Sequence, residues 1–125
     1  MANVLIAEDD TMILKAMNAM LVRAGHTVVC AVDGKEALEH LEDDSYDLVI
    51  TDLMMPHVTG LEVVKKLRSN PAKNRTGIIL VTSISDEDTI MQAFAFGADD
   101  YIAKPAKPRE LNTRINHVLA VRAVA

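Results

Sequence analysis

Five polar side chains in this sequence stand at or just after the ends of short apolar runs, where they could act together: Glu8, Asp9, Asp52, Thr82 and Lys104. Carboxylates brought close together repel each other, and proteins tolerate that arrangement where a cation neutralises the charge. An all-oxygen ligand set without thiol or imidazole suits a hard ion, Mg²⁺ in the first place and Mn²⁺ as the alternative. A carboxylate beside such an ion can attack phosphorus, while a lysine and a hydroxyl bind the phosphoryl oxygens. Asp52, Lys104 and Thr82 fit those three roles.

Each of these residues also has a purely structural interpretation. Asp9 or Asp10 could cap a helix, Asp52 could open a loop, and Lys104 could be a solvated surface lysine. The chemical interpretation therefore depends on whether the fold brings the side chains to one place.

The apolar runs are rich in Val, Ile and Leu and mostly lack polar alternation, which is typical of strands buried on both faces. They cover residues 4–7, 28–32, 48–51, 78–82 and 101–103. Apolar residues at helical spacing lie between and after the runs. The fourth helix is predicted over about 86–96 with Ser85 as its N-cap, and the last over about 108–121. Strand and helix thus alternate five times, which predicts a doubly wound α/β fold, a (βα)5 sandwich with a parallel sheet.

In folds of this class, ligands bind outside the carboxyl ends of the strands. Four of the five runs end in the polar residues described above, so the fold class is expected to gather them at one edge. The second run ends in Asp33-Gly34, which predicts a turn. Met12, Met17 and Met20 lie along the first predicted helix and are expected to fill the core or its margin.

Composition limits the classes of function. A chain of 125 residues makes about one domain, so residues 1–125 are expected to form a single domain without an output domain. Thirteen Lys and Arg against 18 Asp and Glu give a net charge of −5, which argues against direct binding to nucleic acid or to a membrane. No signal peptide or membrane span is predicted. The single cysteine, Cys30, is expected to be a buried, inert thiol in a reducing cytoplasm.

Four motifs follow one another on successive elements in a recognisable order. They are Glu8-Asp9, residues 51–60 (Thr-Asp-Leu-Met-Met-Pro-His-Val-Thr-Gly), residues 81–83 (Val-Thr-Ser) and residues 97–105 (Gly-Ala-Asp-Asp-Tyr-Ile-Ala-Lys-Pro). In these motifs the chain resembles the receiver domain of two-component response regulators, of the chemotaxis-regulator type, over nearly its whole length. The resemblance implies a flavodoxin-like sheet with strand order 2-1-3-4-5 and a bacterial, cytoplasmic signalling protein.

The resemblance also implies a role for each acidic residue. Asp52 would accept a phosphoryl group from a histidine kinase or a histidine phosphotransfer protein. Asp9 and Asp52 would hold Mg²⁺ together with the backbone carbonyl of Met54, and Glu8 would assist through water. The domain would catalyse only its own phosphorylation and dephosphorylation, and would not be an enzyme in the ordinary sense.

By the same resemblance, Thr82 and Lys104 would contact the phosphoryl group, and Thr82 and Tyr101 would form the conformational switch. Ile90, Phe94 and Tyr101 would lie on the partner face made by the fourth helix, fifth strand and fifth helix. That face would control a downstream effector or an output domain outside this chain, or pair two copies in a homodimer. Phe94 and Phe96 project about 200° apart on a helix, so one of them is expected to be partly exposed.

Two other classes of function remain open from the sequence. A Mg²⁺-dependent phosphohydrolase similar to the haloacid dehalogenases would also use Asp52 as nucleophile, but such enzymes usually carry a second aspartate where Met54 stands. A pseudo-receiver would bind partners without phosphate. The complete set of acidic, hydroxyl and amine residues favours the phosphoacceptor.

Overall fold

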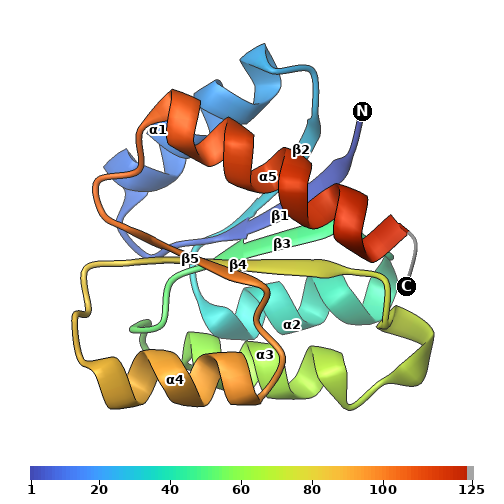
Figure 1. The fold of residues 1–125 in the computed structure, drawn as a ribbon, viewed down its shortest axis with the longest axis vertical. Helices are drawn as coiled ribbons and strands as arrows, with labels where there is room; N and C mark the ends of the chain where they lie inside the picture. The colour runs from blue at the N-terminus through green and yellow to red at the C-terminus, as the bar shows by residue number, and fades with distance from the viewer. Residues whose placement is uncertain (124–125) are drawn as a thin grey trace.

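A single five-stranded sheet forms the centre of the computed structural model, which describes residues 1–123. The order across the sheet is β2-β1-β3-β4-β5, and every pairing is parallel. The strands are β1 (Asn3–Ala7), β2 (Thr27–Ala31), β3 (Leu48–Thr51), β4 (Gly77–Thr82) and β5 (Asp100–Ala103). The helices are α1 (Thr11–Arg23), α2 (Gly34–Asp43), α3 (Gly60–Arg68), α4 (Glu87–Ala95) and α5 (Pro108–Ala123). A short 3₁₀ helix, η1 (Pro71–Lys73), precedes β4. The predicted fold class and strand order are confirmed (Figure 1).

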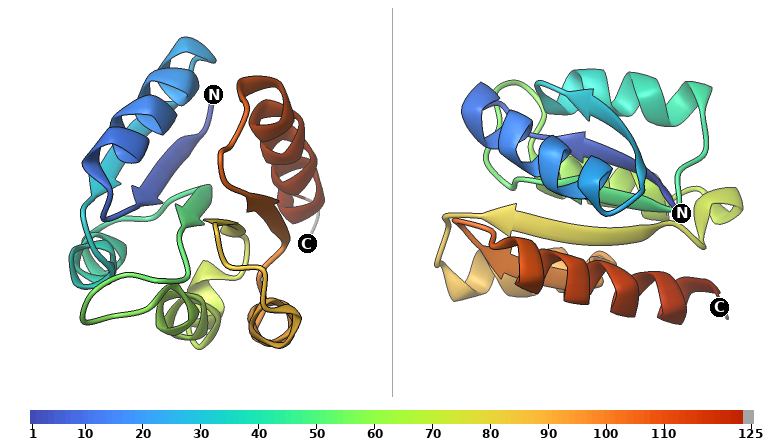
Figure 2. Two further views of the ribbon diagram at one scale, coloured as in Figure 1. Left: turned by 90° about the vertical axis from the view of Figure 1, so that its left-hand side faces the viewer. Right: turned by 90° about the horizontal axis from the view of Figure 1, so that it is seen from above.

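Helices cover both faces of the sheet, α1 and α5 on one side and α2, α3 and α4 on the other (Figures 1 and 2). Successive strand residues point to opposite faces. In β1, Val4 and Ile6 join the core beneath α1 and α5, whereas Leu5 and Ala7 join the core on the other side. Because both faces are buried, the strands carry no polar alternation.

Two helix starts differ from the sequence-based expectation. Helix α4 begins at Glu87 with Asp86 as its N-cap, not Ser85, and no side chain bonds the first backbone N–H groups there. Asp33, expected in a turn, caps α2, because its Oδ1 accepts the backbone N–H of Glu36 at 2.8 Å. Aspartate followed by glycine occurs both in turns and at helix N-caps, so the Asp-Gly dipeptide alone does not distinguish the two structures.

Two expectations about burial also change. Met17 is buried and Met20 is half-buried, but Met12 is 81% exposed at the start of α1. Cys30 is half-buried in β2, and burial raises the pKa of its thiol, which keeps the thiol in its unreactive protonated form. None of the helices within residues 1–123 combines the length and hydrophobicity that crossing a bilayer requires.

Candidate functional site

The strand register brings the first acidic residues together. Ala7 of β1 is level with Thr51 of β3, so the residues that follow, Glu8 and Asp52, leave the sheet side by side. The backbone N–H of Asp52 donates to the carbonyl of Ala7 at 3.1 Å, which fixes the end of β3 against β1. Two segments 44 residues apart in the chain therefore place their carboxylates at one edge of the sheet.

Glu8, Asp9 and Asp52 form an acidic cluster in which one carboxylate oxygen from each lies within 4.8 Å of the others. Glu8 and Asp52 are buried, and Asp9 is exposed. Asp10, not Asp9, caps α1, since its Oδ1 accepts the backbone N–H groups of Met12 and Ile13. Asp9 is therefore free of the capping role and available to a ligand.

Lys104 joins this cluster from the end of β5. Its backbone N–H donates to the carbonyl of Thr82 at 3.0 Å, and its ammonium pairs with Asp52 Oδ2 at 2.6 Å and with Glu8 Oε1. Burial acts to lower the pKa of Lys104, but the contacts with Asp52 and Glu8 outweigh burial and raise the pKa above its usual value. Burial raises the pKa of Glu8, with the contact from Lys104 opposing it. Lys104 is a half-buried cation that neutralises two buried carboxylates.

The Asp52 carboxylate is held from two sides. Its Oδ1 accepts the backbone N–H of Leu53 at 2.6 Å and of Met54 at 3.3 Å, and its Oδ2 accepts Lys104. These donors fix the orientation of the carboxylate, which a carboxylate nucleophile requires. The Met54 side chain is exposed beside it.

Thr82 and Tyr101 are connected through a residue that the sequence did not single out for this role. The Thr82 hydroxyl is buried and accepts the backbone N–H of Ile84 at 3.2 Å. The hydroxyl of Tyr101, on β5, donates to the carbonyl of the same Ile84 at 3.1 Å. The backbone of Ile84 thus links the Thr82 hydroxyl at the end of β4 to the Tyr101 ring on β5. Because both bonds use backbone groups of Ile84, the identity of this residue in the sequence does not reveal the link.

The predicted partner face is partly apolar and exposed. Ile90 is half-buried, and Phe94 and Phe96 are 36% and 37% exposed, so both rings, rather than one, reach the surface. The residue of α4 that enters the core is Ala93. Phe96 lies beyond the end of α4, where the ammonium of Lys65 from α3 sits 4.4 Å from its ring centroid.

Gly60 is the last residue of the motif over residues 51–60, but its role in the site follows only from the structure. A Cβ at this position would lie 1.9 Å from the backbone carbonyl oxygen of Asp52, far inside van der Waals contact. The backbone N–H of Gly60 donates to the carbonyl of Leu53 at 2.9 Å, closing the loop that follows the phosphoacceptor candidate. The start of α3 therefore packs directly on that loop.

We expect Gly60→Ala to destabilise the fold by about 1–3 kcal/mol, the usual cost of forcing an extra group into a packed site. Urea unfolding would measure the loss, and Lys66→Ala, on the exposed side of the same helix, is the matched control. Since the clash involves backbone at Asp52, chemistry at Asp52 should slow as well. Unchanged stability in Gly60→Ala would show that the loop moves aside freely.

The residues present suit a hard divalent cation. The cluster offers carboxylate oxygens from Glu8, Asp9 and Asp52, and no cysteine or histidine belongs to it among residues 1–123. Mg²⁺ and Mn²⁺ take such oxygens and keep several water ligands, which the exposed side of Asp9 leaves room for. The backbone carbonyl of Met54 stays a prediction as a further ligand.

Comparison with known proteins defines the class that this fold and site indicate. The family model of the response regulator receiver domain matches residues 4–116. The chain belongs to that family, and it is a receiver domain of two-component signalling, as the sequence motifs predicted.

Individual relatives agree with that assignment. The alkaline phosphatase synthesis transcriptional regulatory protein PhoP of Bacillus subtilis is 35% identical over 122 residues, which cover 98% of this chain and 50% of that protein. The chain therefore spans about half the length of the curated relatives it matches. Among solved structures, chemotaxis response regulator CheY4 of Vibrio cholerae has a TM-score of 0.88 at 32% identity, with 94% of this chain and 98% of that one covered.

A third comparison concerns the metal. The receiver domain of a sensor histidine kinase from Pseudomonas aeruginosa has a TM-score of 0.87 at 26% identity, covering 95% of this chain and 98% of that one. That structure was solved with a magnesium ion coordinated in its active site cleft.

Proposed function

We propose that this domain is a phosphoacceptor switch that takes a phosphoryl group from a phosphohistidine of a histidine kinase or histidine phosphotransfer protein onto Asp52. The observation that carries the proposal is the Asp52 carboxylate, buried, fixed by two backbone N–H groups and paired with Lys104 beside an acidic cluster. The domain would act in the bacterial cytoplasm and would modify only itself.

The proposed step needs no general base, because the ionised carboxylate has no proton to lose. An oxygen of Asp52 attacks the phosphorus, the bond between phosphorus and the imidazole nitrogen breaks, and the imidazole leaves with the electron pair of that bond. Lys104 keeps its contact with the acceptor while donating to the new phosphoryl oxygens, and the Thr82 hydroxyl donates to another. A bound Mg²⁺ would neutralise the acidic cluster and the phosphoryl oxygens.

The test is to incubate the protein with Mg²⁺ and acetyl phosphate and to follow its intact mass. A single stable phosphoryl adduct is the expected result, since Asp52 is one buried acceptor. Continuous release of phosphate from the donor without an adduct would favour the phosphohydrolase class. No adduct with acetyl phosphate or with a phosphorylated histidine kinase would favour a pseudo-receiver and overturn the proposal.

Mg²⁺ should stabilise the fold, because a divalent cation relieves the repulsion among Glu8, Asp9 and Asp52. At a concentration tenfold above its Kd, the expected gain is about 1.4 kcal/mol, measured as a rise in Tm. Asp9→Asn should remove most of that rise, whereas Asp10→Asn, at the helix cap, should keep it. The magnesium-containing relative supports this proposal. An equal response in Asp9→Asn and the parent would exclude Asp9 as a ligand.

The link through Ile84 supports a switching route to the face formed by α4, β5 and α5. A phosphoryl oxygen on Asp52 would draw the Thr82 hydroxyl toward it, which weakens the bond that Thr82 accepts from the N–H of Ile84. The Ile84 segment would then move, and with it the carbonyl that anchors Tyr101. Ile90, Phe94 and Tyr101 would respond as one face, biasing an existing equilibrium. A downstream effector, an output domain or a second copy would read that face.

Thr82→Ala should therefore accept phosphate but lose the conformational response. The measurement is the change in the ring signals of Tyr101 by NMR on phosphorylation, which we expect to fall several-fold. Thr113→Ala, on the exposed side of α5, is the control and should respond as the parent does. A full Tyr101 response in Thr82→Ala would place the coupling elsewhere.

A further inference from the structure

Helix α4 is held to the rest of the domain more firmly at its C-terminal end than at its N-terminal end. It lies at the end of its layer, beside α3 (Figures 1 and 2). Within residues 1–123 no side chain caps its first backbone N–H groups, which capping side chains commonly satisfy in other helices. The carboxylate of Asp86 bonds instead to the hydroxyl of Thr89 at 2.6 Å, and residues 85–88 are all exposed. The first turn of α4 is therefore weakly anchored.

The C-terminal end of α4 is closed by three backbone hydrogen bonds. The N–H groups of Phe96, Gly97 and Ala98 donate to carbonyls of α4 at 2.9, 3.0 and 3.0 Å. Gly97 has a φ of 116°, in the left-handed region that glycine adopts readily and that often terminates helices. Ala93 and Ala98 are both buried in the core. This end of the helix is therefore fixed by backbone bonds and by packing.

Arg68, in the last turn of α3, ties the same end to the sheet. Its Nε donates to the carbonyl of Gly97 at 3.0 Å, and its Nη1 donates to the carbonyl of Thr76, just before β4, at 2.7 Å. Its Nη2 pairs with Asp99, just before β5, at 3.0 Å. A Cβ at Gly97 would lie 2.6 Å from Cγ of Arg68, so the arginine stem packs directly on the glycine. One guanidinium thus joins α3, both strands and the end of α4.

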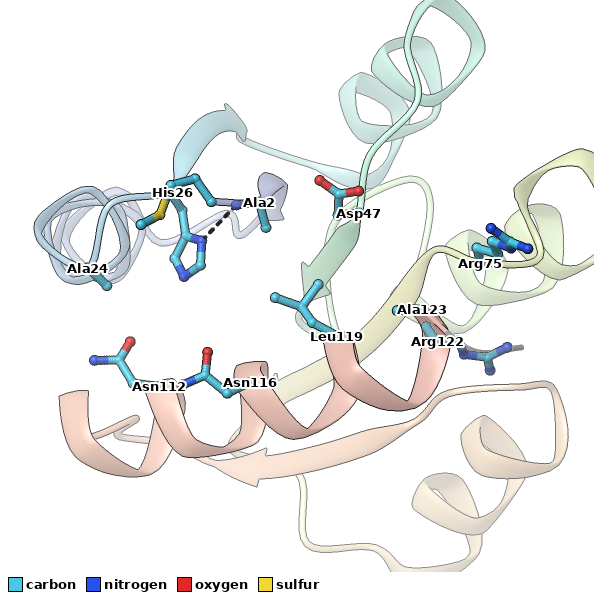
Figure 3. Close-up of a pocket in the computed structure, with 11 residues that line it drawn as sticks. Ala2, Ala24, His26, Asp47, Arg75, Asn112, Asn116, Leu119, Arg122 and Ala123 are labelled. Atoms are coloured by element: carbon cyan, nitrogen blue, oxygen red, sulfur yellow. Dashed lines mark hydrogen bonds between the residues drawn. The ribbon is translucent and has the colours of Figure 1, made fainter.

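The carboxylate of Asp99 is itself held from several sides. It accepts the backbone N–H of Ile78 in β4 at 2.8 Å and the guanidinium of Arg122 at 2.6 Å. Arg122 also donates to the carbonyl of Asn74 at 3.1 Å, and Figure 3 shows it in the last turn of α5, beside the segment that leads into β4. The C-terminal end of α4 is therefore attached to a network that includes β4, β5 and α5, at the edge of the sheet opposite Asp52.

We propose that α4 is hinged about Gly97, with Arg68 as the positioning residue of the hinge, and that its N-terminal end swings when the Ile84 segment moves. That segment directly precedes the weakly anchored end, and its backbone carries the bonds to Thr82 and Tyr101. Because nine residues of helix span about 13 Å, a tilt of about 10° would move the start of α4 by about 2 Å. The exposed apolar side chains of α4 would then change their position relative to β5. The swing rests on the proposed function, whereas the hinge does not.

Amide hydrogen exchange of the unphosphorylated chain tests the hinge. We expect the N–H of Ile90 to exchange at least about tenfold faster than those of Gly97 and Ala98, relative to their intrinsic rates, because the weakly anchored end opens locally. Arg68→Met should raise the exchange rates of Gly97 and Ala98 about tenfold, the scale of losing one charged hydrogen bond. Arg122→Met is the matched control, since it removes a guanidinium from the same network without touching α4.

Gly97→Ala provides a second variant. Its Cβ would displace Arg68, and its φ disfavours any side chain, so it should have the same effect on exchange as Arg68→Met. A merely structural role of Arg68 would lower the overall stability in Arg68→Met and Arg122→Met without a change specific to α4. Equal exchange at both ends of α4 in the parent, or the same exchange pattern in both arginine variants, would overturn the hinge.

The swing is tested after phosphorylation by acetyl phosphate. Changes in backbone NMR shifts should be largest from Ile84 to Ile90 and several-fold smaller at Gly97, and Arg68→Met should remove that difference. Changes as large at Gly97 as at Ile90 in the parent would overturn the swing. A chain that takes no phosphate would overturn the proposed function and the swing with it, while the exchange measurement decides the hinge on its own.

Discussion

Asp52→Asn is expected to abolish phosphoryl incorporation from acetyl phosphate, from one group per molecule to none. The asparagine side-chain oxygen can still accept the N–H groups of Leu53 and Met54, so the loop should keep its shape. A neutral amide lacks the charge and the lone-pair reactivity that the carboxylate brings to phosphorus. Intact mass with and without donor measures the effect.

The control for this experiment is Asp43→Asn, an exposed carboxylate at the end of α2 that should keep full incorporation. Tm measured in the same samples guards against loss through unfolding. Phosphoryl incorporation into Asp52→Asn would contradict the assignment of Asp52 as the acceptor. The exposed carboxylate of Asp9 would then be the next acceptor to test.

The second large effect concerns stability. Lys104→Met should cost roughly 3–5 kcal/mol without divalent ions, because it leaves Glu8 and Asp52 buried without their cation. The raised pKa of Lys104 means that its contribution is fully present below its ordinary value of 10.5 and is lost as pH rises through the higher folded-state value. In acid the cost should also shrink, since the raised pKa of Glu8 means that this carboxylate takes up a proton as pH falls. Urea unfolding over a range of pH measures both the loss of stabilisation at high pH and the smaller cost in acid.

A double-mutant cycle with Asp52→Asn isolates the ion pair. If Lys104 acts by neutralising Asp52, Lys104→Met should cost less in the Asp52→Asn background than in the parent. Mg²⁺ should restore part of the stability of Lys104→Met, because it supplies positive charge to the same oxygens. Equal costs in both backgrounds would mean that Lys104 does not stabilise the fold by neutralising Asp52.

The identities of the reactive groups and the fold class were readable from the chain. Strands buried on both faces require unbroken apolar runs, as in β1 and β4, and the parallel α/β arrangement puts the residues after those runs at one edge. Glu8, Asp52, Thr82 and Lys104 could be selected for that reason. The strand order came from motif resemblance, because local patterning does not state which strands are neighbours.

Helix starts and surface positions were less well determined. Asp33 and Asp86 are N-caps that dipeptide patterns did not identify, and Met12 is exposed although its type favours burial. Capping depends on backbone angles at one residue, and a half-buried helix tolerates either polarity at its margin. The position of an N-cap and the burial of a residue at a helix margin depend on small free-energy differences, which contacts with neighbouring elements override.

Tertiary structure alone decided the contacts between distant segments. Lys104 meets Glu8 and Asp52 because strands β1, β3 and β5 end at the same edge, and Ile84 connects Thr82 with Tyr101 through its backbone. These features depend on distances between residues far apart in the chain. The amino-acid pattern sets which groups can interact, but packing of the helices on the sheet sets which ones do.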